Sequence, residues 1–518
     1  MICYGGAFLE VLERLNGIVW GVPALVMILG VGFYLSVRTG FAQIRLLPRS
    51  LKLFCSRLRG CGDADGSVTP FQALCTALAA TVGTGNIAGV AGAITIGGPG
   101  SIFWMWICGI LGMMTKFAEA SLAVRYRIRN DSGELSGGPM YMIRRGMDRK
   151  FHWLASLYCF FGVVAAFGVG NATQINAVVT GIRQSAEYFG FSPGKILNLT
   201  VGVILALLIS LMLSGGAKRI GMLAERLVPF ASAAYMLLGC GVLLMCRRQI
   251  VPAFTMIIRG AFSPQAVTGG IVGSGLIALR TGVSRGVFTN EAGMGTASIA
   301  HASANVSHPV EQGMMGIVEV FFDTILICTM TALVILCSGV SVPYGQDTGA
   351  ALTTHAFSVI YGGWVSIYMA LSLCCFAFAT VLGWGLYGIR CAQYLFGAAS
   401  GRKFVLLQAV IVVLATVLET KTVWLISETV NGLMAIPNLI ALAVLSPELF
   451  RLLSEYRSIS GRFSANGGTY ENFDQCKPLR TVPYAEIPSP GSGSQETGKD
   501  YLSPEYRSAR SGNTPGLL

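Results

Sequence analysis

The stretch FQALCTALAATVGTGNIAGVAGAITI, residues 71–96, sets the architecture of the whole chain. It is apolar and long enough to cross a bilayer, which takes about 20 residues of helix. Its middle, however, reads VGTGN at 82–86, and a glycine inside a helix costs about 1 kcal/mol relative to alanine. The sequence therefore predicts a membrane helix that is broken near its centre.

A break at that depth exposes backbone N–H and carbonyl groups that lipid cannot satisfy, so it persists only against protein, water or a bound ligand. Half-helix ends that face a midplane cavity suit a zwitterion and a small cation, as in many secondary transporters. A glycine-rich packing face between helices is an alternative explanation of the same residues. This stretch alone leaves both interpretations open.

The composition places the chain in a membrane. Hydrophobic residues make up 53% of the 518 residues and charged residues only 12%, whereas soluble proteins carry about 25% charged residues. The net charge of +12 comes mostly from arginines and lysines in short loops and the tail, where they set membrane orientation. We therefore expect an all-α polytopic membrane protein and no nucleic-acid ligand. The fourteen cysteines are scattered through apolar segments and predict neither a disulfide framework nor a metal site.

Basic loops give the expected orientation. A cluster of arginines and lysines at 38–59 predicts a cytoplasmic loop, an N-terminus outside the cell and a cytoplasmic C-terminus; we expect no cleaved leader. The pattern favours eleven spans, one leading helix and ten core helices, at about 16–37, 71–96, 101–124, 151–179, 196–213, 227–246, 266–300, 313–338, 364–387, 404–418 and 423–445.

Residues 266–300 are too long and too glycine-rich for one regular span, so we expect a second broken helix there. It lies five spans after the first, and an odd number of spans makes the two halves inverted, with a binding site between their breaks. The expected divisions are 1–70, an N-terminal helix and basic loop; 71–450, a ten-helix transport core with repeats at about 71–246 and 266–446; and 451–518, a disordered cytoplasmic tail.

Polar side chains at three places are candidate ligands. Thr81 and Thr84 flank the first break, where free N–H groups suit a carboxylate; bonds back to helical carbonyls are the structural alternative. Asn171 and Gln174 share a helical face at i, i+3, and interhelical hydrogen bonding explains them equally well.

Thr380 and Trp384, four residues apart, also face one way. Together they suit a cation ligand and an apolar lid on a small substrate. An ordinary aromatic at a helix interface is the alternative for the tryptophan.

Charged residues inside spans are functional candidates by default, although internal ion pairs explain them equally well: Lys116, Glu119, Arg285, Glu291, Glu319 and Asp323. Lys116 and Glu119 have the spacing of a pair, and Glu319 and Asp323 share a face. Asp323 is the best candidate for proton or ion coupling. Nothing predicts an enzyme, because His301 and His308 lack metal-ligand spacing and no nucleotide-binding glycine loop occurs.

Four stretches resemble the alanine/glycine:cation symporters, which are bacterial and archaeal sodium-coupled amino-acid transporters. They are ATVGTGNIAGVAGAITIGGPGSIFWMW (80–106), SGGPMYMI (136–143), GVSRGVFTNEAGMGTASIA (282–300) and FAFATVLGW (376–384). With the spacing between them they cover nearly the whole chain from about residue 16 to 445.

The resemblance implies a leucine-transporter-like fold of five plus five inverted helices with one extra N-terminal helix, and it implies alanine or glycine as substrate. The family's site positions correspond to Thr81, Thr84, Gly85, Gln174, Thr380 and Trp384. Thr380 would bind sodium together with backbone carbonyls near Ala80 and Gly83. Ala172-Thr173 and Ile175 depart from the family pattern around the glutamine, which leaves the preference among glycine, alanine and serine open.

We therefore expect a multi-pass symporter of the plasma (inner) membrane that imports alanine and glycine, coupled to sodium, by alternating access. The alternative is a proton-coupled amino-acid transporter of the same fold, with Asp323 or Glu319 as proton carrier. A channel or receptor would not need two broken helices in inverted register. The expected partners are a small amino acid, sodium and the lipid bilayer, with no cofactor besides the coupling ion and no obligate protein partner.

Overall fold

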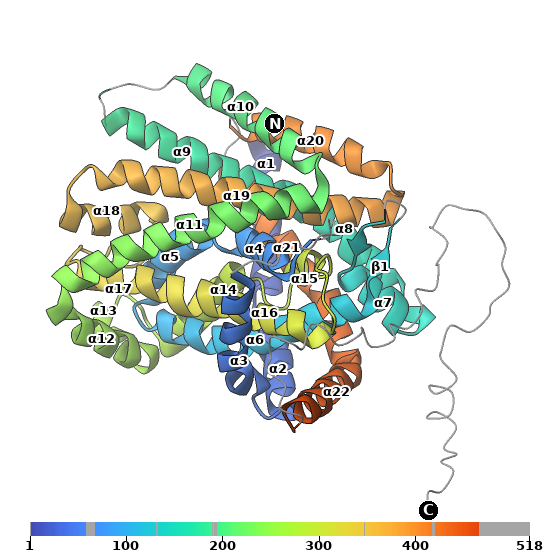
Figure 1. The fold of residues 1–518 in the computed structure, drawn as a ribbon. Coiled ribbons are helices and arrows are strands. Elements are labelled where there is room, and N and C mark those ends of the chain that lie inside the picture. The colour runs from blue at the N-terminus through green and yellow to red at the C-terminus, as the bar shows by residue number, and fades with distance from the viewer. Residues whose placement is uncertain are drawn as a thin grey trace, which may run out of the picture. The chain divides into compact units, whose positions relative to one another are not determined.

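The computed structural model describes residues 2–58, 68–130, 133–188, 190, 194–346, 348–416 and 420–465. Helices dominate these ranges (Figure 1), and the two short strands β1 (Ile128–Arg129) and β2 (Leu135–Ser136) pair antiparallel in one loop. The prediction of an all-α membrane protein is confirmed.

The first half of the chain contains α1 (Ile2–Val19), α2 (Val22–Arg38), α3 (Ala42–Leu58), α4 (Pro70–Thr81), η1 (Gly85–Gly89), α5 (Val90–Gly97), α6 (Ser101–Tyr126), α7 (Pro139–Gly146), η2 (Arg149–Phe151), α8 (Trp153–Phe167), η3 (Gly168–Ala172), α9 (Thr173–Tyr188), α10 (Lys195–Leu213) and α11 (Gly216–Met245). Here η1 and η3 are π-helical, while η2 is a 3₁₀ turn.

The second half contains η4 (Arg247–Gln249), α12 (Ile250–Phe262), α13 (Gln265–Thr268), α14 (Gly275–Asn290), α15 (Thr296–His301), α16 (Pro309–Val320), η5 (Phe321–Cys328), α17 (Thr329–Cys337), α18 (Ala350–Tyr361), α19 (Val365–Phe396), α20 (Ser400–Ala415), α21 (Thr420–Val444) and α22 (Ser446–Ala465). Of the two η segments, η4 is a 3₁₀ turn and η5 is π-helical.

The described residues contain eight helices that are long and apolar enough to cross a membrane, or nine if the bent pair α4 and α5 counts as one span. Two of the predicted spans are not among them. Residues 266–300 are divided between shorter helices, and α20 has only 16 residues. The count of eleven therefore stays a prediction.

The start of α4 follows directly from its sequence. Thr69 Oγ1 accepts the N–H of Gln72 at 3.1 Å, and Gln72 Oε1 accepts the N–H of Thr69 at 3.2 Å, with Pro70 in the first turn. This capping box satisfies donors that a helix start leaves unpaired. Thr69 and Pro70 therefore set the start of α4.

The break predicted in 71–96 is also confirmed. The axis bends by 50° between α4 and the segment Gly85–Gly97. Val82, between them, has extended backbone with φ −75° and ψ 104°. The chain then resumes in the π turn η1 instead of an α-helical turn.

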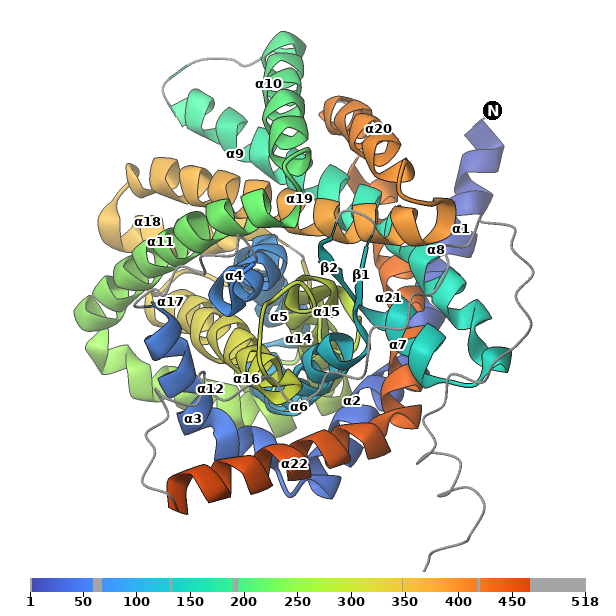
Figure 2. The ribbon, with the colours of Figure 1, turned by 45° about the vertical axis from the view of Figure 1, so that its right-hand side comes forward.

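Around this break the helices form two groups. On one side α6 packs against α14 and α16, and on the other α19 packs against α8, α9 and α20. Figure 2 shows α4 lying between them, with α11 and α19 on one side and α14 and α16 on the other. The broken helix is thus enclosed by protein, as a helix with interrupted hydrogen bonding must be in a bilayer.

Some predicted boundaries were wrong. The span expected at 227–246 begins earlier, because α11 starts at 216 and contains the basic residues Lys218, Arg219 and Arg226. The span expected at 151–179 contains the π turn η3 and continues in α9 to Tyr188. The segment between the spans expected at 313–338 and 364–387 contains the helix α18.

The tail expected to start at Arg451 does not start there, because α22 continues the helix to Ala465. Leu449, Leu452 and Leu453 are buried, and α22 contacts α6, α16 and α21. These apolar residues recur on one face, so the helix gains burial that a composition argument overlooks. The rest of the predicted tail lies outside the described residues.

Candidate functional site

The break between α4 and η1 forms one wall of a small buried cavity. Its volume is about 20 Å³, which holds about one water molecule. It is lined by Ala80, Thr81, Gly83, Thr84, Gly85, Val169, Gln174, Phe288, Glu291, Thr380 and Trp384. The structure therefore brings together every residue that the sequence singled out as a ligand candidate from the family resemblance.

Close packing of the break against α19 explains one of its glycines. A Cβ on Gly83 would lie 2.9 Å from Thr380 Oγ1, closer than real side chains approach, whereas a Cβ on Gly85 would meet Thr289 at an ordinary 3.5 Å. Gly83 N–H donates to Asn86 Oδ1 at 2.8 Å, so the break is held partly by its own amide side chain. Gly83 is therefore required for the approach of Thr380, while Gly85 has space beside it.

Polar contacts link the break to the helices that face it. Thr84 Oγ1 donates to Gln174 Oε1 at 3.3 Å, and Gln174 Nε2 donates to the Val169 carbonyl at 3.2 Å. Thr380 Oγ1 donates to the Ala79 carbonyl at 3.0 Å. The hydroxyl of Thr81 bonds back to the Ala77 carbonyl at 3.3 Å, which is the structural use foreseen for it.

Asn171 on η3 and Gln174 on α9, which were expected to share a helical face, bind different neighbours. Asn171 Nδ2 donates to the Gln408 carbonyl on α20 at 3.2 Å, while Gln174 faces the break. Their spacing of three was expected to put them on one face of a regular helix. The π turn η3 inserts an extra residue into the helical phase, so that expectation was wrong.

The second interruption lies between α14 and α15. Its turn runs from Glu291 to Gly295, with φ values of 53° at Glu291, 94° at Gly293 and 75° at Gly295. Glu119 Oε1 on α6 accepts the N–H groups of Gly293 at 2.9 Å and Gly295 at 3.0 Å, and also Asn438 Nδ2 at 2.7 Å. A buried carboxylate therefore satisfies the donors of this turn.

An ion network beside that turn corrects one prediction. Lys116 Nζ binds Glu319 Oε1 on α16 at 2.9 Å instead of pairing with Glu119. Glu319 Oε2 contacts His301 Nε2 at 2.9 Å, and His301 Nδ1 contacts Gln312 at 2.7 Å. All four residues are buried. The network joins α6, α15 and α16 and satisfies Glu319 on both oxygens.

Asp323 occupies a different environment from Glu319. Its Oδ1 accepts Asn86 Nδ2 at 2.7 Å, and its Oδ2 accepts Thr324 Oγ1 at 2.8 Å. Since Asn86 also accepts the Gly83 N–H, a single amide connects Asp323 to the break. Among the described residues, no group of three or more His, Cys, Asp or Glu side chains is placed to hold a metal ion.

Three residues that line the cavity were not among the predicted ligands: Val169, Phe288 and Glu291. Glu291 carried a signal, since a carboxylate inside a span was already a functional candidate. Val169 and Phe288 are apolar residues in apolar spans, so nothing in their type distinguishes them from core residues. Only the packing of η3 and α14 around the break identifies them.

Comparison with known proteins supplies the family. Residues 6–465 match the sodium:alanine symporter family. The chain is 42% identical to the sodium/alanine symporter AgcS of Methanococcus maripaludis over 85% of this chain and 95% of that protein. It is 41% identical to an uncharacterized transporter of Haemophilus influenzae, over 86% and 96% of the two chains.

The fold has a counterpart among solved structures. The crystal structure of MhsT in complex with L-phenylalanine superposes with a TM-score of 0.52 at 14% identity, covering 72% of this chain and 88% of that one. At that identity the likeness concerns the leucine-transporter-like fold alone.

The sequence relatives are transporters and not enzymes. Because the family match covers most of its length, the chain belongs to the sodium:alanine symporter family.

Proposed function

We propose that this chain imports small neutral amino acids, alanine and glycine, together with sodium, by alternating access across the plasma (inner) membrane. The observation that carries the proposal is a small buried cavity where the break of α4, Gln174, Thr380 and Trp384 meet. The name of the relative AgcS supports the choice of alanine and sodium. The coupling sodium ion is the only cofactor in this proposal.

The substrate is proposed to bind by its charged ends. Its carboxylate would accept N–H groups from the first turn of η1, which lack preceding helical carbonyls and are not capped by the Thr84 side chain. Its ammonium group would donate to carbonyls of the break and to Gln174. A small side chain would then face Trp384, whose indole excludes branched side chains by overlap.

Sodium is proposed to bind between α4 and α19. It prefers hard oxygen ligands, and Thr380 Oγ1 lies 3.0 Å from the Ala79 carbonyl. A rotation of that hydroxyl would turn its lone pairs to an ion shared with the carbonyls near Ala80 and Gly83. Because the ion and the substrate would both contact the break, each would favour the same local conformation, which is the basis of coupling.

Alternating access follows from the size of the cavity. With room for about one water molecule, it must enlarge before an amino acid enters. The helices that surround it fall into two groups, α6, α14 and α16 against α8, α19 and α20. Movement of one group against the other would open the cavity to one side of the membrane at a time.

Proton coupling is the second candidate function. The contacts of Glu319 and Asp323 favour one of these two carboxyl groups as its proton carrier. Glu319 is bound to Lys116 and His301, so accepting a proton there would remove the negative charge that pairs with Lys116. Asp323 contacts no basic side chain within hydrogen-bonding distance among its described partners and connects to the break through Asn86. Asp323 is therefore the carrier that this alternative requires.

The test is uptake of labelled alanine into proteoliposomes, with sodium and proton gradients imposed separately. Accumulation driven by the sodium gradient at equal pH is expected. Accumulation driven only by the proton gradient would favour the alternative through Asp323. A protein that moves alanine at the same rate with or without either gradient would contradict symport.

A further inference from the structure

We propose that Glu291 is a positioning residue for substrate size selection, because its carboxylate holds the indole of Trp384 in place at the cavity wall. This inference rests on the proposed function, since it concerns which side chains the cavity admits. Glu291 belongs to the second interruption and Trp384 to α19, so the contact joins the two helix groups that meet at the cavity.

The backbone of Glu291 is unusual for its residue type. Its φ is 53°, and Phe41 is the only other described residue besides glycine with a positive φ. A non-glycine residue in the left-handed region is uncommon and costs free energy. This conformation ends α14 at Asn290, with the Glu291 N–H bonded to the Val287 carbonyl. The side chain leaves the axis of α14 and reaches α19.

Both oxygens of the carboxylate are used. Oε1 accepts the indole N–H of Trp384 at 3.0 Å, and Oε2 accepts the hydroxyl of Thr296 at 2.6 Å. Two donors from separate helices, α19 and α15, therefore hold this carboxyl group in place. The turn that carries Glu291 is held by further hydrogen bonds, because Glu119 binds the N–H groups of Gly293 and Gly295.

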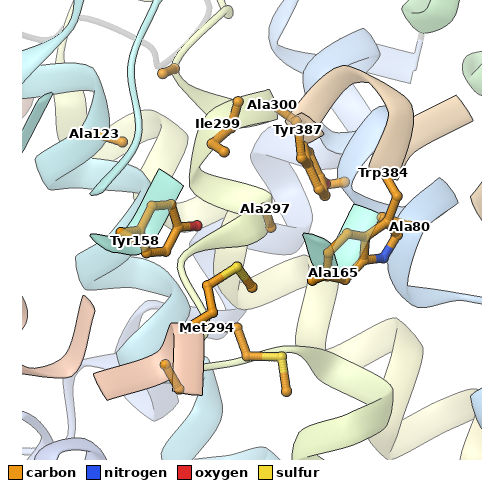
Figure 3. Close-up of a cluster of buried hydrophobic side chains, with 14 of the residues drawn as sticks. Ala80, Ala123, Tyr158, Ala165, Met294, Ala297, Ile299, Ala300, Trp384 and Tyr387 are labelled. Atoms are coloured by element: carbon orange, nitrogen blue, oxygen red, sulfur yellow. The ribbon is translucent and has the colours of Figure 1, made fainter. Parts of the chain in front are cut away.

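The indole has apolar or backbone neighbours elsewhere. A Cβ on Gly170 would lie 2.2 Å from Trp384 Cβ, so η3 packs directly against the base of the side chain. The ring of Tyr387 lies 5.8 Å away. In Figure 3 the tryptophan lies near Ala80 and Ala165, with Tyr387 on the same helix facing Ala300. The N–H is the sole polar atom of the indole, so Glu291 determines where that edge points.

Among the described residues that line the cavity, Glu291 alone is charged. Its two oxygens already accept hydrogen bonds from protein donors, which favours an action through Trp384. If the carboxylate is removed, the indole edge loses its acceptor and can rotate within the space that opens. The wall that would exclude branched substrates then loses its fixed position.

The test measures competition against labelled alanine uptake in proteoliposomes, using valine and glycine as unlabelled competitors. Glu291→Ala should lower the valine concentration needed for half-inhibition, relative to glycine, by about tenfold. Glu291→Gln keeps an acceptor oxygen for the indole, and the Thr296 hydroxyl can reverse its role. This variant should retain most of the discrimination.

Trp384→Phe tests the contact from the other side, since it keeps an aromatic ring and removes the N–H. It should relax the discrimination as Glu291→Ala does, and the double variant should go no further than either single one. Discrimination that stays at the wild-type value in Trp384→Phe would overturn the proposal. So would equal losses of alanine affinity in Glu291→Gln and Glu291→Ala with discrimination unchanged, which would indicate that the charge itself binds ligand.

A measurement without transport separates this inference from the proposed function. Ultraviolet resonance Raman difference spectra between the wild type and Trp384→Phe isolate the indole N–H band of this tryptophan in detergent. The band should shift towards that of a free N–H in Glu291→Ala and stay in Glu291→Gln. An unshifted band in Glu291→Ala would overturn the inference, whereas failure of the wild type to take up alanine would reject the proposed function instead.

Discussion

The two interrupted helices differ in which side chains accept hydrogen bonds from their backbone N–H groups. At the first interruption, between α4 and η1, a π turn begins without a side-chain cap and borders the cavity. At the second, between α14 and α15, the N–H groups of Gly293 and Gly295 are both bound by the buried carboxylate of Glu119. The first interruption borders the cavity and is held by Asn86, a side chain of its own segment, while the second is held by a carboxylate from another helix.

This contrast separates two reasons for breaking a membrane helix. The start of a helical turn beside a cavity suits a ligand, while N–H groups held by a neighbouring helix fix the turn that carries them. On this account the first interruption binds the substrate and the second forms a rigid wall that carries Glu291. Substitutions in the first interruption should therefore weaken ligand binding. Substitutions that remove the hydrogen-bond acceptor of the second interruption should lower the stability of the protein.

The largest effect is expected at Gly85. Gly85→Leu should abolish alanine binding, because the side chain would fill a cavity of about 20 Å³. The protein should still insert and remain monodisperse in detergent. Gly85→Ala is the matched control, since its Cβ would lie at an ordinary 3.5 Å from Thr289, and it should retain measurable binding. Full binding by the leucine variant in a scintillation proximity assay would mean that the glycine serves packing alone.

Glu119→Ala should chiefly lower stability. It would leave three buried donors without their acceptor, and each unsatisfied group costs about 1–3 kcal/mol. The apparent Tm in detergent should fall clearly further than in Glu119→Gln, which keeps one acceptor oxygen. Equal Tm values for the two variants would show that the second interruption does not depend on this carboxylate.

Thr380→Ala should have a smaller and more selective effect. Loss of one hydroxyl ligand, worth about 1.4 kcal/mol, corresponds to about a tenfold rise in the sodium concentration for half-maximal uptake. The alanine requirement at saturating sodium should rise less. Thr380→Ser retains the hydroxyl and serves as control. Unchanged sodium dependence of Thr380→Ala would remove this residue from the proposed ion site.

Much of the site could be predicted because the residues that indicate it lie close together in the sequence. Two glycines around Thr84 within an apolar span indicate a break, because glycine is a poor helix former. The spacing of four between Thr380 and Trp384 put both on one face of α19, and both line the cavity.

Other features depend on contacts between distant segments. The partners of Lys116 and Glu119 lie on α16 and in the 291–295 turn, and helical spacing favoured a local pair instead. The π turn η3, which contains Gly168 and Gly170, directs Asn171 towards α20 and Gln174 towards the break, whereas the i, i+3 spacing assumed a regular α-helix. The helix α22 was mistaken for a tail because its polar composition concealed the buried face around Leu449.

Amide hydrogen exchange with and without alanine and sodium tests most directly the claim that the two interruptions have different roles. Peptides covering 83–89 should gain strong protection when both ligands are present, because the ligands would bind the backbone of the first interruption. Peptides covering 293–297 should change little, since Glu119 already holds Gly293 and Gly295. Ligand-dependent protection confined to 293–297, with 83–89 unchanged, would contradict the account.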